Sequence, residues 1–229
     1  MALLYRIPVT GGIKCGADRS WQLLTRGAAK RKSCGAGKSG GSPMDFSVAR
    51  PDVVRAVNQR WLLKTWMRHL GTQRVPQWQA VEVEDLSRVS AGLSFLDVTG
   101  RDGDARFQIR FHGATIGQVY GSADCRGKYL DEIIPAAHRT NGLAPYQQAV
   151  HRCRPVYTIH DVTDRIGRTV HYERLLLPFA ADSQTVDRIL ASFEFICVDG
   201  AFDGRDLMKS QSAPPALRLS ATIERQAAV

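Results

Sequence analysis

The hydrophobic period of the sequence changes after Gly92, and this change constrains the fold more than any other feature. Before Gly92, apolar residues recur at spacings of three and four, whereas after it they alternate with polar ones. The alternation is strictest at residues 107–112. Because successive side chains of a strand point to opposite faces, this segment predicts a β-strand with Phe107, Ile109 and Phe111 facing the core.

Four other segments have the length and the apolar, β-branched and aromatic content of strands. Together with residues 107–112 they predict five strands, at residues 93–98, 107–112, 156–162, 170–179 and 186–198. The turn residues 100–104 join the first two strands into a β-hairpin. Short helices are expected between the second and third strands, one ending before Pro135 and another beginning at Pro145. This order predicts an α+β domain, a five-stranded antiparallel sheet with short helices on one face.

A long amphipathic helix is predicted before the sheet. Apolar residues recur at helical spacing from Pro51 to Leu70, a length of about five turns. A second, shorter helix is expected between Pro76 and Gly92. The polar side of the long helix presents three basic residues at successive i+4 positions, Arg60, Lys64 and Arg68. Such a stripe could contact nucleic acid, a membrane surface or an acidic partner, although solvated helix faces often have the same composition.

The expected boundaries divide the chain into four parts: a basic tail at 1–43, the N-terminal helix at 44–75, the sheet domain at 76–199 and a loose C-terminal tail at 200–229. The basic tail has no sustained apolar period and is followed by a second methionine, Met44. We therefore expect it to be a disordered tail or the product of a misassigned start. Its segment Gly35–Ser39 imitates a phosphate-binding loop, but Lys32 occupies the place of a required glycine.

Composition excludes several classes of protein. The net charge of +9 lies mostly in residues 1–43, which hold eight Lys and Arg residues against one Asp, so the folded part has no field that would steer a polyanion. No stretch reaches the roughly 18 apolar residues of a membrane span. The five cysteines are widely spaced and form no C-x-x-C pair, which argues against a disulfide framework and a zinc site. We expect a cytoplasmic protein without a transmembrane segment.

The order of elements and four local stretches resemble the PAS superfamily of sensory domains, most closely its proteobacterial branch of small single-PAS proteins. The four stretches are residues 107–113 with Tyr120-Gly121 after them, residues 127–131, residues 172–179 and residues 186–190. The resemblance extends from about Asn58 to Val198 and makes residues 76–199 a PAS-like domain. It implies a sensory or regulatory module. Because no kinase, cyclase or helix-turn-helix segment follows, the signal would pass through a protein partner or a homodimer.

The resemblance also implies a space for a small molecule between the sheet and the short helices. The candidate lining residues are Phe107, Ile109, Phe111, Phe193 and Phe195 from the sheet and Tyr129, Ile133 and Tyr146 from the helices. Such a lining is apolar enough to exclude water from a ligand. The same side chains could instead fill each other's space, so a ligand pocket and a fully packed core both remain open.

The cofactor is not identified by the sequence. Haem-binding PAS domains use a helix histidine below the iron, which leaves His138 and His151 as the residues to test. A lone histidine in such a place is usually exposed or hydrogen-bonded, so haem is not expected. Flavin photochemistry is not expected either, because the surroundings of Cys125 do not reproduce the required helix motif. No third ligand accompanies His171 and Glu173, so no metal site is predicted.

Two other functional classes remain open beside the sensory one. An isomerase-type enzyme could use a buried carboxylate for proton transfer, and Glu173 and Glu194 are the residues to test. No G-x-S-x-G or H-E-x-x-H motif occurs, and we do not expect an enzyme. A nucleic-acid or membrane-surface adaptor would use the stripe of Arg60, Lys64 and Arg68, but no exposed strand interleaves aromatic residues for base stacking. Nucleic acid is therefore not the expected partner.

Overall fold

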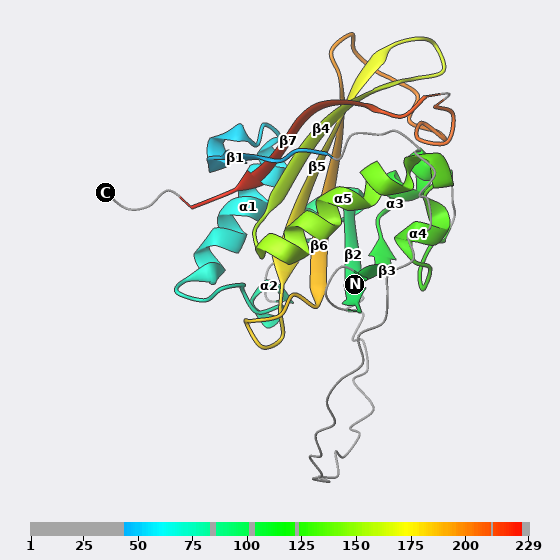
Figure 1. Ribbon diagram of the computed structural model, residues 1–229. Helices are drawn as coiled ribbons and strands as arrows, with labels where there is room; N and C mark the ends of the chain where they lie inside the picture. The colour runs from blue at the N-terminus through cyan, green and yellow to red at the C-terminus, as the bar shows by residue number, and fades with distance from the viewer. Residues whose placement is uncertain (1–43, 83–85, 101–103, 122–123, 212, 226–229) are drawn as a thin grey trace, which may run out of the picture. The chain divides into compact units, whose positions relative to one another are not determined.

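The computed structural model describes residues 44–225, apart from residues 83–85, 101–103, 122–123 and 212 (Figure 1). The predictions for residues 1–43, including the Gly35–Ser39 segment, lie outside the described residues, as does the tip of the hairpin turn at residues 101–103. No helix in the described part of the chain is long and apolar enough to cross a membrane.

A seven-stranded sheet forms the centre of the described residues. Its strands are β1 (Ser47–Ala49), β2 (Leu93–Thr99), β3 (Arg106–His112), β4 (Val156–Thr163), β5 (Thr169–Phe179), β6 (Arg188–Cys197) and β7 (Ala216–Ile223). Their order across the sheet is β1-β7-β4-β5-β6-β2-β3. Strands β2 to β6 are the five predicted ones and pair antiparallel, as expected. The predicted total of five strands was wrong, because β1 and β7 extend the sheet.

Strand β7 contradicts the prediction of a loose tail at residues 200–229. It pairs antiparallel with β4, and β1 pairs in parallel with its other side. In Figure 1, β7 runs along β4 with β1 next to it. Ala221 and Ile223 are fully buried. The physical reason is the edge of β4, which would otherwise carry a row of unpaired backbone N–H and C=O groups.

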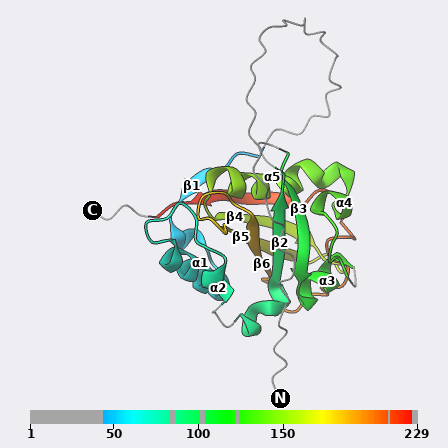
Figure 2. The ribbon, with the colours of Figure 1, turned by 90° about the horizontal axis from the view of Figure 1, so that it is seen from below.

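Helices cover both faces of the sheet rather than the one face predicted. Helices α3 (Ala114–Tyr120), α4 (Leu130–Ile133) and α5 (Ala136–Arg152) pack on one face, while α1 (Val57–Leu70) and α2 (Gln79–Glu82) pack on the other. Figure 2 shows α1 and α5 on opposite sides of the central strands. Each face has its own hydrophobic cluster. Strand β5 is consequently buried on both faces, and nine of its eleven residues are buried, the charged Glu173 and Arg174 among them.

Helix α1 is shorter than predicted, because it begins at Val57 and not at Pro51. Pro51–Val53 forms a separate 3-10 turn, and the extended backbone at Val54 places that side chain in the core. From Val57 the helix follows the predicted spacing and ends before Gly71, whose φ is +51°. Its apolar side packs on β4 and β5, and Trp66 Nε1 donates a hydrogen bond to the Pro178 carbonyl (2.7 Å).

Two other helix predictions were also corrected. The helix expected between Pro76 and Gly92 is a short α2 followed by a 3-10 helix at Ser87–Gly92. Helix α5 begins at Ala136, and Pro145 lies inside it instead of at its start. Proline inside a helix removes one backbone hydrogen bond. Helix α5 is nevertheless continuous, because Tyr146 and Ala149 are buried against the sheet on the C-terminal side of the proline.

Candidate ligand-binding site

A cavity of about 50 Å³ lies between the sheet and helices α3, α4 and α5. Four of the eight predicted pocket residues line it: Ile109, Ile133, Tyr146 and Phe193. The structure adds residues that the resemblance did not single out, among them Ile116, Tyr120 and Arg174. A volume of this size holds a very small molecule or a few waters, and it is far below the several hundred Å³ of a drug-sized pocket.

Two more predicted residues, Phe107 and Phe195, do not line the cavity but pack against the aromatic rings at its sheet side. Phe107 is 1% exposed, and its ring centroid lies 5.3 Å from that of Tyr146. Phe195 stacks on Tyr172 with the ring centroids 5.2 Å apart, and Tyr172 stacks on Phe193 in turn. These rings fill the sheet side of the site, so they fix its floor rather than contact its contents.

Phe111 does not face the cavity, which corrects the prediction. The register between β2 and β3 shifts between Phe95 and Leu96, so that Phe111 pairs with Phe95 but Ile109 pairs with Leu96. Arg110 is the extra residue of this β-bulge. A shift of one residue reverses the face of every later side chain. Phe111 therefore packs on the α1 side, 5.3 Å from the Phe95 ring, and His112 turns toward the cavity in its place.

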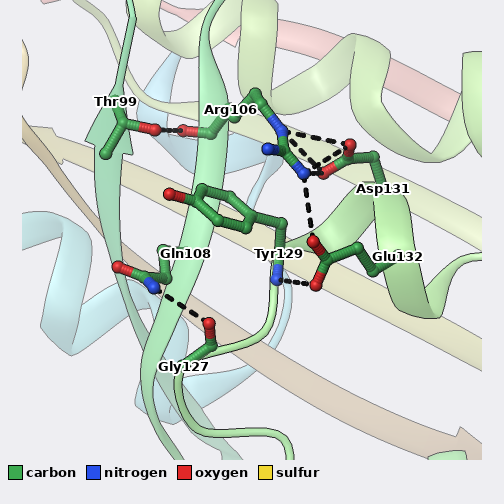
Figure 3. A network of polar contacts seen from close by, with 7 residues as sticks. All are labelled: Thr99, Arg106, Gln108, Gly127, Tyr129, Asp131 and Glu132. Carbon is green, nitrogen blue, oxygen red and sulfur yellow. Dashed lines mark hydrogen bonds and ion pairs between the residues drawn. The ribbon is translucent and has the colours of Figure 1, made fainter.

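Tyr129 also lies outside the cavity, in a polar network at the surface (Figure 3). The Arg106 guanidinium lies 3.8 Å from the Tyr129 ring centroid and forms ion pairs with Asp131 and Glu132. Hydrogen bonding to Asp131 raises the pKa of Arg106. The backbone N–H of Tyr129 donates to Glu132 Oε2 (3.0 Å), which caps the N-terminus of α4.

The network around Tyr129 explains why residues 127–131 carry part of the family resemblance. Gln108 Nε2 donates to the Gly127 carbonyl (2.9 Å), as Figure 3 shows, and the backbone of Ile109 bonds both Gly127 and Lys128. The segment therefore covers the outer edge of β3, which would otherwise be free to pair with another strand. Gly127 has a φ of +81°, which glycine adopts without strain. The contacts of this motif hold α4 and the preceding turn against β3.

Arg174 is the charged group of the cavity. It lies on β5 between Thr158 of β4 and Phe193 of β6, and it is only 5% exposed. Its Nε donates to Thr158 Oγ1 (3.3 Å), and its Nη1 donates to the carbonyl of Gly142 in α5 (3.3 Å). Both acceptors are neutral. No Asp or Glu within the described ranges forms an ion pair with it.

Three tyrosines surround this cation. The Arg174 guanidinium lies 5.1 Å from the Tyr146 ring centroid and 5.8 Å from that of Tyr172. The hydroxyls of Tyr120 and Tyr172 are hydrogen-bonded to each other (3.2 Å). Burial raises the pKa of Tyr146 to about 12, with Arg174 acting in the opposite direction, and burial also raises the pKa of Tyr120. The phenols of Tyr120 and Tyr146 are therefore neutral, and they carry no negative charge that would form an ion pair with the arginine.

His160 lies on the same face of the sheet. It is 7% exposed, and its ring packs against Tyr172 with the centroids 5.8 Å apart. Burial and, to a smaller extent, the nearby Arg174 charge lower the pKa of His160 to about 3. Its Nδ1 is buried without a hydrogen-bond partner. This face of the sheet thus holds one permanent cation and a neutral imidazole.

His112 separates the cavity from a surface groove of about 620 Å³. The backbone N–H of Cys125 donates to His112 Nε2 (3.0 Å), so in the neutral ring the proton is on Nδ1. Gly117 of α3 also borders both spaces. The two residues thus form a wall that the cavity and the surface groove share.

The two histidines suggested for haem do not line the cavity. His138 is half-buried near the start of α5, and His151 is exposed near its end. No group of three or more His, Cys, Asp or Glu residues that could hold a metal ion occurs within the part of the chain that the structure describes. The structure thus brings neither histidine to the ligand site.

The carboxylates suggested for catalysis lie on the α1 face of the sheet, away from the cavity. Glu173 is 2% exposed and accepts a hydrogen bond from Tyr157 Oη (2.6 Å). Glu194 accepts one from Asn58 Nδ2 (3.1 Å). Among the described residues that line the cavity there is no acid, so the structure offers no carboxylate base there for the proton transfer considered above.

The basic stripe is exposed. Arg60, Lys64 and Arg68 lie on the outer side of α1, opposite the residues that pack on the sheet. Their placement on one helix face agrees with the i+4 spacing. Exposure alone does not distinguish a contact surface from a solvated helix face.

Sequence reasoning missed Arg174 and His112 for different reasons. Arg174 had a readable signal, because strand alternation places it in an inward position between the apolar residues Tyr172 and Leu176. A charge at such a position is unusual unless it is paired or functional. His112 had no such signal, since its direction depends on the bulge at Arg110.

Short helices that enclose a small cavity against a mainly antiparallel sheet define a class of small α+β sensory domains. A family model of the PAS domain matches residues 54–194, more than half of the chain. The chain therefore belongs to the PAS domain family, whose members are sensory or regulatory modules. A comparison with curated proteins found no match. The matched residues include all of α1, which the sequence analysis had separated from the domain.

Proposed function

We propose that the protein is a PAS sensory module that binds a small ligand beneath α3, α4 and α5 and signals to a protein partner or a second copy of itself. The observation that carries this proposal is the cavity of about 50 Å³ within an otherwise packed core. Protein interiors have few voids larger than a water molecule. A void bordered by the polar ends of Tyr146, His112 and Arg174 is suited to a specific occupant.

The short covering elements allow the site to admit such an occupant. Helix α4 has only four residues, and Ile133 and Ile134 at its end are half-buried. Gly142 of α5 lies close to Ile134, because a Cβ placed there would be 3.2 Å from Ile134 Cδ1. A ligand larger than the cavity would therefore displace the contact between α4 and α5 first.

A path of direct contacts connects the cavity with α1. Arg174 and Glu173 are neighbours on β5 and point to opposite faces of the sheet. On the α1 face, Gln59 Nε2 donates to the backbone carbonyls of Glu173 (3.3 Å) and Ser192 (3.0 Å). A shift of β5 on ligand binding would thus reach α1, whose outer side carries Arg60, Lys64 and Arg68. This route supports signalling through α1 to a partner.

The proposal includes a finer assignment, that the chain is one of the small single-PAS proteins of proteobacteria, and the resemblance in the sequence supports it. The cytoplasmic location is part of it as well, since free cysteines are typical of a reducing compartment. Haem and flavin form no part of the proposal.

Native mass spectrometry of the full chain, purified from bacterial cells, tests the proposal. We expect a bound small molecule, and a change in subunit number or partner capture when that molecule is removed. The variant Ile133→Phe fills the cavity and should abolish ligand retention, while Leu143→Phe adds the same ring to another half-buried site, where it should have no effect. Absence of any bound molecule, together with unchanged assembly after addition of cell metabolites, would refute the sensory proposal.

A further inference from the structure

The uncompensated charge of Arg174 identifies the chemical class of the ligand. Arg174 is 5% exposed and borders the cavity, and among the described residues its guanidinium forms hydrogen bonds only with neutral groups. Buried charges in proteins are normally paired with an opposite charge, because an unpaired one loses its hydration without compensation. The tyrosine faces near it offer partial compensation only. The positive charge of Arg174 therefore lacks one negative counter-charge, which a bound anion could supply.

The rest of the lining determines what kind of anion fits. Apart from its few polar groups, the cavity is bordered by aliphatic and aromatic side chains, namely Ile109, Ile116, Leu130, Ile133, Ile134 and Phe193. An inorganic phosphate or sulfate needs hydrogen-bond donors on all sides, which this lining does not supply. A carboxylate needs donors at one end only, and arginine is the side chain that best matches its two oxygens.

The volume limits the length of the apolar part. About 50 Å³ accommodates a carboxylate group with a short alkyl chain, and each further methylene requires α4 to move away from the sheet. The wall formed by His112 and Gly117 is shared with the surface groove, so a ligand can enter where these two residues move apart. The polar head would then meet Arg174 at the floor, while the alkyl group contacts the isoleucines.

We propose that the PAS cavity binds a short-chain aliphatic monocarboxylate, whose carboxylate pairs with Arg174 and whose alkyl group occupies the apolar lining. This proposal rests on the proposed sensory function and specifies its ligand. Cell metabolism supplies such acids as products of fermentation and of fatty-acid breakdown, so the site would report on the level of a small acid.

Titration of the full chain with acetate, propionate and butyrate tests the proposal, with sodium chloride keeping the ionic strength constant. The Nε–Hε signals of ¹⁵N-labelled arginine report directly on the guanidinium. We expect saturable shifts of one such signal, and an affinity for butyrate at least tenfold higher than for butyramide, its neutral analogue. Sulfate and phosphate should produce no saturable shift. Equal binding of butyrate and butyramide, or a saturable response to sulfate, would overturn the proposal without any variant.

Two variants test whether carboxylate binding depends on Arg174. Arg174→Met should abolish carboxylate binding, while Arg110→Met removes the same charge from an exposed position on β3 and should leave binding unchanged. Carboxylate binding that persists in a folded Arg174→Met protein contradicts the inference. If mass spectrometry finds a neutral ligand in the cavity, the sensory function stands and the carboxylate assignment fails. If neither experiment detects a ligand, both fail together.

Discussion

Two residues that are adjacent in sequence, Glu173 and Arg174, carry opposite charges and are both buried, yet they cannot pair. Neighbouring side chains of a strand point to opposite faces, so each must find its partner on its own side of the sheet. Glu173 accepts a hydrogen bond from Tyr157 on the α1 side, whereas Arg174 meets neutral groups on the cavity side. On one face of β5 the buried charge of Glu173 has a hydrogen-bond donor, and on the other face the buried charge of Arg174 has no opposite charge among the described residues.

Removal of the Tyr157 hydroxyl should destabilise the protein. Burial and the hydrogen bond to Glu173 raise the pKa of Tyr157, so the phenol is a donor at all ordinary pH values. Tyr157→Phe leaves the buried Glu173 carboxylate without this donor, and we expect a loss of about 1–3 kcal/mol in the free energy of unfolding. Chemical denaturation measures this loss. Tyr129→Phe is the matched control, because Tyr129 is half-exposed, and a loss as large as that of Tyr157→Phe would contradict the assignment.

His160 should make the stability of the protein depend on pH. Its pKa is lowered to about 3 in the folded protein, whereas an unfolded histidine has a pKa of about 6.5. Between these two values the unfolded chain binds a proton that the folded chain does not. The contribution of neutral His160 is therefore complete above about pH 6.5, and it is lost progressively as the pH falls toward 3.

Replacement of this histidine isolates its contribution. His160→Phe keeps an aromatic ring next to Tyr172 and removes the titrating group. Between pH 4.5 and 5.5, the difference in unfolding free energy between the original and the variant protein should change by about 1.4 kcal/mol per pH unit. Urea denaturation at a series of pH values measures it. A constant difference over that range would show that His160 is protonated in the folded state, contrary to expectation.

At the scale of elements, the sequence predicted the strands whose pattern is local and missed those that depend on distant partners. Strands β2 to β6 combine apolar content with clear turn signals, so they were found. Strand β7 follows the polar, proline-containing region before Ala216 and owes its structure to pairing with β4. The three-residue β1 is even shorter and pairs only with β7 in turn. Tertiary pairing of this kind leaves little trace in the local sequence.

The residues of the candidate site were also predicted only in part, because some of their positions depend on distant contacts. Ile109, Ile133, Tyr146 and Phe193 were found because periodicity and the family resemblance place them on inward faces. Phe111 was misplaced since a single bulge residue reverses the alternation, and no sequence signal marked Arg110 as that residue. Tyr129 was misplaced because its ring is held over the surface by Arg106.

Strand β7 should prove essential to the sheet. Ile223 is fully buried in the cluster under α1, and Ile223→Ala should lower the free energy of unfolding by about 2–5 kcal/mol. Leu217 lies on the same strand but is 43% exposed, and Leu217→Ala should cost less than about 1 kcal/mol. Denaturant titration of both variants compares them. Equal and small losses would mean that the C-terminal strand is as loose as its composition first suggested.

At the scale of the whole domain, the sheet is buried on both faces, and this changes where the domain begins. The cluster on the α1 side includes Leu175, Leu177, Phe179 and Leu190, which are at most 1% exposed. Removal of α1 would leave these strand residues in water. The family match from residue 54 agrees with this packing, since it includes α1 in the PAS domain. Helix α1 is therefore part of the domain core and is hydrogen-bonded directly to the backbone of β5.

The length of chain needed for folding tests this view directly. A chain that begins at Met44 keeps β1, α1 and both clusters, and we expect it to unfold in one cooperative transition with dispersed NMR signals. A chain that begins at Pro76 lacks the α1 residues Leu62, Leu63 and Trp66, each at most 2% exposed in the intact protein. Each large buried side chain contributes about 1.5–3 kcal/mol, which together is comparable to the whole stability of a typical domain. The shorter chain should thus aggregate or bind a hydrophobic dye. If it instead folds cooperatively and retains ligand, α1 is an appendage and cannot transmit the signal through the core.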